Sequence, residues 1–244
     1  MTGSPVAMSD LIFINFSDAD PAPTNATTDG KGPDFTIGAA PKSDIYASPR
    51  QPTVLYDYTA PAVCRRVHKA HFKSVQVTAA AAWRTQFDQA GLLFTLPTRN
   101  NPEPNAANAG NVTHHPAWIK AGIEVNDGCP CVSVVARAPG GTGGWSDWSL
   151  IPLTLAGEKL GPILPVTIHF EREKNALTIW LLRDGGSTRL FIRKVPWVFL
   201  DDETGTLGED VLVGAYAAQP DPYDESKGES LKVTFSGLKI ETTS

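Results

Sequence analysis

The segment from Trp118 to Val125 alternates strictly between apolar and mixed side chains. The apolar set is Ile119, Ala121, Ile123 and Val125, and the mixed set is Trp118, Lys120, Gly122 and Glu124. Because successive residues of a β-strand point to opposite faces, this pattern predicts a strand with one face in a core. The other face presents an indole, a cation and an anion, with about 6.6 Å between residues two apart. We expect that face to line a binding groove rather than to meet open solvent.

Short strand-like runs separated by turn signals recur along the rest of the chain. They span residues 11–16, 63–67, 71–78, 86–96, 132–137, 148–155, 164–171, 176–183, 190–198, 211–218 and 231–241. Turns such as Asn126-Asp127-Gly128 are typical of β-hairpins. No segment keeps a helical period over many turns; Ala79–Ala82 is interpreted as one helical turn at most, and residues 37–52 as loop-rich. The pattern predicts an all-β fold, either a sandwich or a barrel.

The length of 244 residues fits one large β domain. The 21 glycines and 20 prolines, with only 19% charged residues, favour many turns over long helices. We expect residues 1–34 to supply an N-terminal strand and a flexible loop that pack on the domain. Residues 35–244 are expected to form the β-sandwich itself.

The charge and the cysteine content limit which partners and which cellular compartment are expected. The formal net charge is −5 and no basic cluster is present, which argues against binding to nucleic acid. No apolar run is long enough to span a membrane, and the N-terminus lacks the pattern of a secretory signal. Cys64, Cys129 and Cys131 are predicted to be free thiols, as is usual in a reducing compartment. We therefore expect a cytoplasmic protein whose partner is a small molecule.

No motif in the sequence indicates a cofactor or an activated nucleophile. The Gly140–Gly144 run lacks the Lys-Ser/Thr of a phosphate loop and is interpreted as a flexible loop or lid. No Gly-x-Ser-x-Gly sequence is present, and His68 and His71 would face opposite ways on a strand. We therefore expect no cofactor and no metal at the site. The acidic loop Asp201–Asp210 has two interpretations, a structural calcium site or a solvated loop. The spacing of its possible oxygen ligands favours the solvated loop.

Several motifs occur in a recognisable order along the chain. They are Gln86–Leu92, Trp118–Glu124, Val132–Val135, Ser146–Ser149, Arg193, Val213–Pro220 and Val233–Phe235. This set resembles the fungal and bacterial "regulation of enolase" family, a family of unknown function. The resemblance is weaker over residues 35–82, where Ser43-Asp44-Ile45-Tyr46 stands where that family tends to have Asp followed by an aromatic pair. It implies a concanavalin A-like jelly-roll β-sandwich of two curved antiparallel sheets, as in lectins and glucanases.

A set of aromatic, charged and amide residues remains as the candidate site. The candidate catalytic residues are Lys120, Glu124, Arg193 and Tyr216. The candidate ligand-binding residues are Trp118, Asp147, Trp148, Trp197 and His115, together with Gln89, which the resemblance places nearby. Apolar walls with a few directed polar groups are typical of small-molecule sites. The plainer interpretation is a set of cross-strand ion pairs over packed aromatic rings, each of little energetic value when exposed.

Two main functions follow as hypotheses. The first is binding of an apolar or sugar-like metabolite in the concave groove of the sandwich. The second is a cofactor-independent cyclase or isomerase, such as a Diels–Alder-type pericyclase of fungal secondary metabolism, which would fold its substrate and polarise a carbonyl. A glycoside hydrolase using Glu171 and Glu173, which share one strand face, and a regulatory protein-binding module are weaker alternatives. The sequence leaves open whether the protein is an enzyme.

Overall fold

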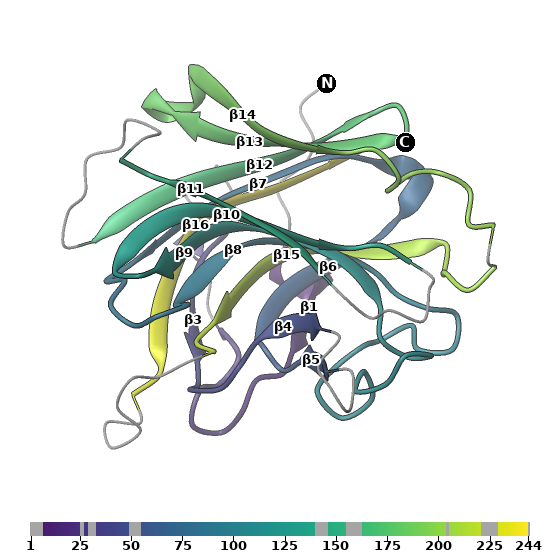
Figure 1. Cartoon of the computed structure of the whole chain (residues 1–244), viewed down its shortest axis with the longest axis horizontal. Coiled ribbons are helices and arrows are strands. Elements are labelled where there is room, and N and C mark those ends of the chain that lie inside the picture. The colour runs from purple at the N-terminus through teal and green to yellow at the C-terminus, as the bar shows by residue number, and fades with distance from the viewer. Residues whose placement is uncertain are drawn as a thin grey trace.

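The computed structural model describes residues 7–24, 27–28, 33–48, 55–139, 146–154, 163–203, 205–220 and 229–243. Within these ranges the chain is almost entirely β-structure (Figure 1). The strands are β1 (Leu11–Ile14), β2 (Thr27–Thr28), β3 (Pro33–Ala39), β4 (Ile45–Ser48), β5 (Leu55–Tyr58), β6 (Ala62–His68), β7 (Phe72–Ala81), β8 (Gln89–Leu96), β9 (Ala117–Asn126), β10 (Cys129–Arg137), β11 (Asp147–Pro152), β12 (Leu164–Glu173), β13 (Ala176–Arg183), β14 (Thr188–Val195), β15 (Asp210–Ala218) and β16 (Leu231–Thr242). Three short 3-10 helices cover Met8–Asp10, Lys69–His71 and Asp184–Gly186.

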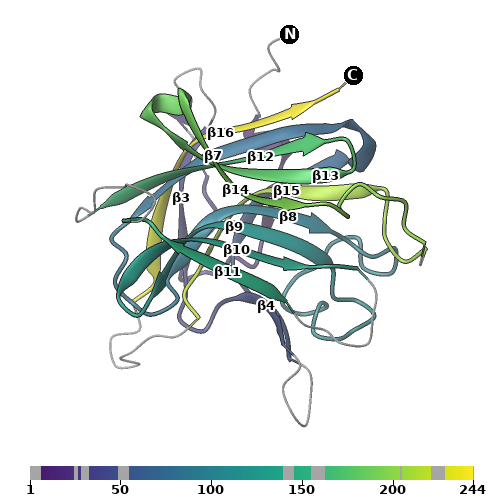
Figure 2. The same ribbon diagram turned by 45° about the horizontal axis from the view of Figure 1, so that its top comes forward.

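The strands form two large antiparallel sheets that pack face to face (Figures 1 and 2). The first sheet has the order β1-β6-β15-β8-β9-β10-β11, and the second has the order β14-β13-β12-β7-β16-β3-β2. Neighbours in each sheet are often distant in sequence; β15, for example, pairs with both β6 and β8. The expectation of a concanavalin A-like all-β sandwich of two curved antiparallel sheets is confirmed.

Apolar residues at alternate strand positions fill the space between the two sheets. On β9, Ile119, Ala121 and Ile123 point into this core, as the alternation predicted. They are at most 1% exposed. The second sheet contributes residues such as Val75 and Phe170, which also lie in this core. Burial of this apolar surface is the main favourable term in the folding of such a sandwich.

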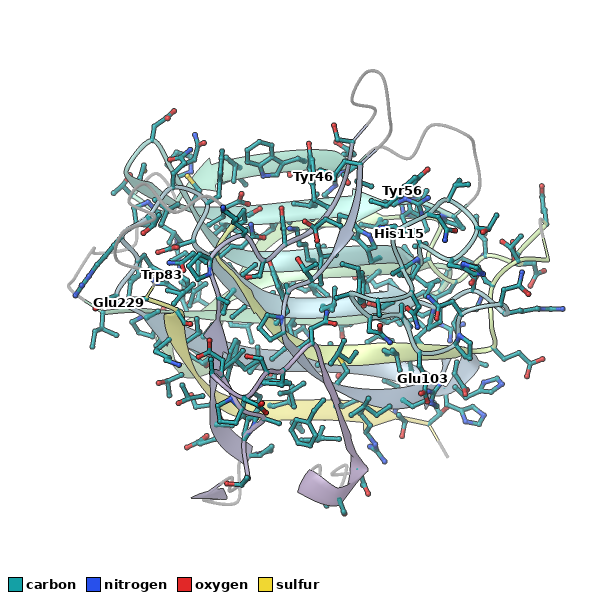
Figure 3. The ribbon with its side chains drawn as sticks, turned by 90° about the horizontal axis from the view of Figure 1, so that it is seen from below. Tyr46, Tyr56, Trp83, Glu103, His115 and Glu229 are labelled. Carbon is teal, nitrogen blue, oxygen red and sulfur yellow. The ribbon has the colours of Figure 1, made fainter. Side chains whose placement is uncertain are left out.

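A third layer covers the outer face of the first sheet, the face turned away from the second sheet. It consists of the β4–β5 hairpin, which we call the cover hairpin, and the loop of residues 97–116 (Figure 3). Ile45 and Tyr58 of the hairpin, Ala109 of the loop, and Trp118 and Tyr216 of the sheet share a second apolar cluster. Because of this layer, β9 is buried on both faces except at Asn126.

The cover hairpin and strand β3 were not predicted. Residues 37–52, which were interpreted as loop-rich, contain β4 and the end of β3, and no strand was expected at Leu55–Tyr58. Strand β7 also continues to Ala81, so the helical turn considered for Ala79–Ala82 is wrong. Strand β1 pairs with β6 in the first sheet, and β3 begins at Pro33, just before the boundary expected at residue 35. The Gly140–Gly144 loop lies outside the described residues. None of the helices in the described ranges is long and apolar enough to cross a membrane.

Candidate functional site

A cavity of about 520 Å³ lies between the outer face of the first sheet and the cover hairpin. Its walls come from strands β4, β5, β8, β9, β10 and β11 and from the turns beside them. The lining residues are Lys42, Asp44, Tyr46, Leu55, Asp57, Phe87, Gln89, Lys120, Glu124, Val135, Trp148 and Pro220. This volume falls in the usual range for small-molecule sites, about 300–1,000 Å³.

Lys120 supplies a buried cation at the floor of the cavity. Its Nζ donates a hydrogen bond to Asp44 Oδ1 at 2.7 Å, and its side chain is only 2% exposed. The same ammonium lies 5.8 Å from the ring centroids of Trp118 and of Tyr216. Aromatic faces attract cations at this range, so the pair and the two rings together hold the ammonium in place. Asp44 reaches Lys120 from the residue that precedes β4, 76 positions earlier in the chain.

Glu124 is the second buried charged group of the cavity. Its Oε2 accepts hydrogen bonds from Ser133 Oγ, on β10, and from Trp148 Nε1, on β11, the latter at 3.2 Å. Burial raises the pKa of Glu124, and the negative charge of Asp44 adds to this rise. Lys120 and the two hydrogen bonds act in the opposite direction. The net effect is a carboxyl group that takes up a proton more readily than one in water.

Asp57 faces the cavity from the cover hairpin. Its Oδ1 accepts hydrogen bonds from the Thr59 hydroxyl at 2.6 Å and from the Thr59 amide at 3.1 Å. Burial raises the pKa of Asp57, and Asp44 adds to the rise by charge repulsion. Three carboxyl groups therefore surround one buried ammonium, and two of the three have raised pKa values.

Aromatic side chains form one wall of the cavity. Trp148 is 41% exposed, and its ring meets that of Phe87 edge to face with centroids 6.0 Å apart. Phe87 has a φ angle of 63°, in the left-handed region that bulky residues rarely adopt. The turn is fixed by buried Asp88, whose carboxylate accepts hydrogen bonds from the amides of Arg84 and Thr85. This turn places the Phe87 ring beside Trp148 in the cavity lining.

The structure brings together only part of the residue set that the sequence suggested. Lys120, Glu124, Gln89 and Trp148 line the cavity. Gln89 holds its position by donating to Phe87 O at 3.2 Å and by accepting from the Tyr216 hydroxyl at 3.2 Å. Tyr216 itself is buried beneath the floor, where burial raises its pKa well above the ordinary value. It therefore supports Gln89 and Lys120 as a neutral phenol instead of lining the cavity.

Trp118 and His115 are placed differently from the expectation of a ligand-stacking indole and a rim imidazole. Both are buried, and Trp118 Nε1 donates to His115 Nε2 at 3.1 Å. The other ring nitrogen of His115 lies 2.8 Å from the carbonyl oxygen of Ala109, so it carries the proton. Burial lowers the pKa of His115 to about 4. The sequence placed Trp118 on the correct face, but the 97–116 loop covers it, so the ring packs in the second apolar cluster.

Arg193 and Asp147 also lie outside the cavity lining. Arg193 is on β14, at the edge of the second sheet, and its guanidinium forms an ion pair with Asp147 on β11. It also donates to Ser149 Oγ at 3.3 Å. These contacts join the edges of the two sheets. Trp197 packs against the core between the sheets. Alternation along a strand could not predict where these side chains lie. It shows which face a side chain is on, but not whether that side chain contacts a ligand or the edge of the other sheet.

Three lining groups that the sequence did not single out are Asp44, Asp57 and Phe87. Asp44 and Tyr46 fall in the stretch where the resemblance suggested an Asp followed by aromatic residues, which was the only local signal for this part of the site. Asp57 lies in the Tyr-Asp-Tyr sequence of β5, whose pairing with β4 was not predicted. Nothing in the sequence around Phe87 indicated its unusual φ angle.

The acidic groups that the sequence suggested for hydrolysis or calcium binding include several with partners of their own. Glu171 pairs with Arg189, and Glu173 pairs with Lys194 at 3.0 Å, both on the exposed second sheet and away from the cavity. In the acidic loop, Asp202 accepts a hydrogen bond from the Leu207 amide at 2.6 Å. Within the described ranges no group of three or more His, Cys, Asp or Glu side chains is close enough to hold a metal ion. The calcium site considered for this loop stays a prediction.

Comparison with known proteins gives a family. The family model described as "Protein of unknown function (DUF1349)" matches residues 22–243. The chain belongs to this family. The expectation of a family of unknown function with a concanavalin A-like fold is therefore confirmed. No curated protein matches the chain.

Solved structures support the same fold. A functionally unknown protein from Saccharomyces cerevisiae superimposes with a TM-score of 0.64 at 20% identity, covering 98% of this chain and 100% of the yeast chain. The GH43 BlXynB protein from Bacillus licheniformis gives 0.56 at 12% identity, covering 96% of this chain and 37% of the other. Xylan beta-1,4-xylosidase from Bacillus halodurans C-125 gives 0.56 at 10% identity, covering 100% and 40%. At these identities the likeness shows the fold alone.

Proposed function

We propose that this member of the DUF1349 family binds a small, hydroxyl-rich molecule such as a sugar unit in the cavity beneath the cover hairpin. The observation that carries the proposal is the composition of the cavity wall. Trp148 and Phe87 offer apolar ring surface, while Gln89, Glu124 and Lys120 contribute polar atoms to the same cavity. A sugar ring has apolar C–H faces, which pack on aromatic rings, and hydroxyl groups at its edges, which form hydrogen bonds with polar side chains. It therefore matches both kinds of lining residue.

The fold neighbours support this proposal. One of them is named as a xylan beta-1,4-xylosidase, and this chain covers about two fifths of its length. The same sandwich therefore also occurs in a protein named for a carbohydrate. The support for this chain comes from the lining side chains, and a two-carboxylate hydrolase based on Glu171 and Glu173 finds no support in their surface ion pairs.

Binding of monosaccharides, measured by calorimetry and by NMR shift changes, tests the proposal. The informative variant is Trp148→Ala, which removes the aromatic wall and is expected to weaken binding at least tenfold, or about 1.4 kcal/mol. Phe191→Ala is the matched control, since Phe191 is an exposed aromatic residue, 53% exposed, on β14 of the second sheet. Equal affinities of the Trp148 variant and the control would refute the proposed site.

A second candidate function, general acid–base catalysis on the bound molecule, is favoured by one observation. Glu124 has a raised pKa in the same cavity as the buried Lys120, and perturbed carboxyl groups of this kind are common among catalytic acids. The cofactor-independent cyclase considered from the sequence is one such reaction, with Lys120 as the hydrogen-bond donor. Time-resolved NMR of candidate ligands distinguishes the two functions, because a binding protein leaves its ligand unchanged whereas an enzyme converts it.

A further inference from the structure

We propose that the ligand carries a positively charged amino group, and that Glu124 and Asp57 bind this group. The inference rests on the function proposed above and names the chemistry that the cavity selects. It starts from the charges and the free oxygen atoms that face the cavity. A protonated amino sugar is the simplest molecule that combines this group with a hydroxyl-rich ring.

The carboxyl groups of the cavity outnumber its buried cations. Asp44, Asp57 and Glu124 face one buried ammonium, that of Lys120. Lys120 is committed to Asp44 at 2.7 Å, and Lys42 stands at the rim with an interaction of its own. Asp57 and Glu124 form no ion pair shorter than 4 Å with any described residue. Glu124 is buried and Asp57 is half-buried, and carboxylates taken out of water without a counter-charge are costly. A cationic ligand would therefore complete the charge balance of the site.

The hydrogen bonds of these two carboxyl groups leave one oxygen atom free on each. In Glu124 both hydrogen bonds end on Oε2, and Oε1 accepts none from the described residues. In Asp57 both hydrogen bonds from Thr59 end on Oδ1, and no residue in the described ranges donates to Oδ2. The two side chains therefore present free acceptors to the cavity. An ammonium group offers three donors and no acceptor, which is the complement of this arrangement. The neighbouring Trp148 ring also favours a cation over a neutral group.

The charged environment of the two carboxyl groups predicts a linked proton release. The groups that face them are Asp44, Lys120 and Lys42, with the thiol of Cys131 beside Glu124 and the phenol of Tyr216 below. Burial and Asp44 raise the pKa of both carboxyl groups. A bound cation lowers both pKa values, so protons held by these groups leave when an amine binds.

The test compares sugars that share one ring and differ at one group. Glucosamine, glucose, N-acetylglucosamine and glucuronate are titrated into the full chain at about pH 6, where the amine is protonated. The same series is repeated with the galactose ring. We expect the amine to bind at least tenfold more tightly than the matching neutral sugar. Calorimetry in two buffers of different ionisation enthalpy should show proton release for the amine alone, a readout that needs no variant.

Variants then assign the preference to the carboxyl groups. Glu124→Gln should bring the ratio of amine to neutral-sugar affinity close to one, and Glu173→Gln, at the surface pair with Lys194, should leave that ratio as it is. Melting curves of both variants confirm folding. Equal binding of glucose and glucosamine would overturn the amine inference and keep the proposed function. Tightest binding of glucuronate or of the N-acetyl sugar would overturn it as well. Binding of none of these sugars would refute the proposed function itself.

Discussion

Replacement of Lys120 by Met tests the electrostatic organisation of the cavity most directly. Methionine keeps much of the length of the lysine stem and removes the ammonium. The buried ion pair with Asp44 is lost, and so are the contacts of the cation with the Trp118 and Tyr216 rings. Asp44, Asp57 and Glu124 are then left in one cavity without a buried counter-charge. We expect a folded protein of clearly reduced stability.

The size of the loss follows from the geometry of the pair. Across 2.7 Å, and with an effective dielectric constant of about 20, the attraction between two unit charges is about 6 kcal/mol. Desolvation of both ions offsets most of this energy, so the intact pair contributes little net stability. Removing one partner of a buried pair nevertheless costs about 3–5 kcal/mol, because the other charge stays behind. Asp44 is 17% exposed, which places the expected loss near the lower end, about 3 kcal/mol.

Urea unfolding of Lys120→Met, Asp44→Asn and the double variant measures this loss and its origin. The double variant should be more stable than Lys120→Met alone, because it no longer buries an unpaired Asp44. Lys194→Met is the matched control: Lys194 pairs with Glu173 at 3.0 Å but is 49% exposed, so its loss should cost less than about 1 kcal/mol. A loss in Lys120→Met no larger than in this control, or no recovery in the double variant, would refute the reasoning.

Further predictions concern the core, two titrating groups and the sheet edges. Ile123→Ala, in the core between the sheets, should cost about 2–5 kcal/mol in urea unfolding. The raised pKa of Glu124 stabilises the folded state fully below pH 4.5, the ordinary pKa of the group, and this stabilisation is lost as the pH rises. The free energy of unfolding, measured between pH 4.5 and 7, should therefore decline less in Glu124→Gln. The lowered pKa of His115 has the opposite effect: it stabilises the folded state above pH 6.5, and this stabilisation is lost as the pH falls towards about 4. NMR titration of the His115 ring should have its midpoint near pH 4. Arg193→Gln should change stability by less than about 1 kcal/mol and leave ligand affinity unchanged; a tenfold weaker affinity would show that this side chain reaches the ligand.

The two large sheets could be predicted because their strands carry their own signals. Strand β9 alternates over its length, and turns such as Asn126-Asp127-Gly128 mark where the chain reverses. The cover hairpin carries no such signal. Its strands Ile45–Ser48 and Leu55–Tyr58 have four residues each, which is too short for a periodic pattern to stand out. They are ordered by pairing with each other and by packing on Trp118 and Tyr216, contacts that join distant parts of the chain.

The candidate site could likewise be predicted only where the signal lies within one strand. Lys120 and Glu124 were predictable, since ionisable groups in a strand with this pattern need partners. Their partners were not: Asp44 comes from the segment before β4, and Ser133 and Trp148 come from β10 and β11. Trp118 lies on the predicted face of β9, but its ring is buried because His115 and the loop before it cover the ring.

The hairpin that the sequence did not reveal therefore determines what the site is. Without it, the outer face of the first sheet would be an open groove in which Lys120 and Glu124 could pair through water. The hairpin packs in one apolar cluster with Trp118 and the 97–116 loop, and the hairpin and the residue before it bring two further carboxyl groups, Asp57 and Asp44, to the cavity. Asp44 forms the ion pair with Lys120 and also raises the pKa of Glu124, while Asp57 adds a further carboxyl group to the cavity lining. The proposed selectivity for a cationic ligand therefore depends on the third layer, and replacing Asp57 by Asn should weaken that selectivity while leaving the sandwich folded.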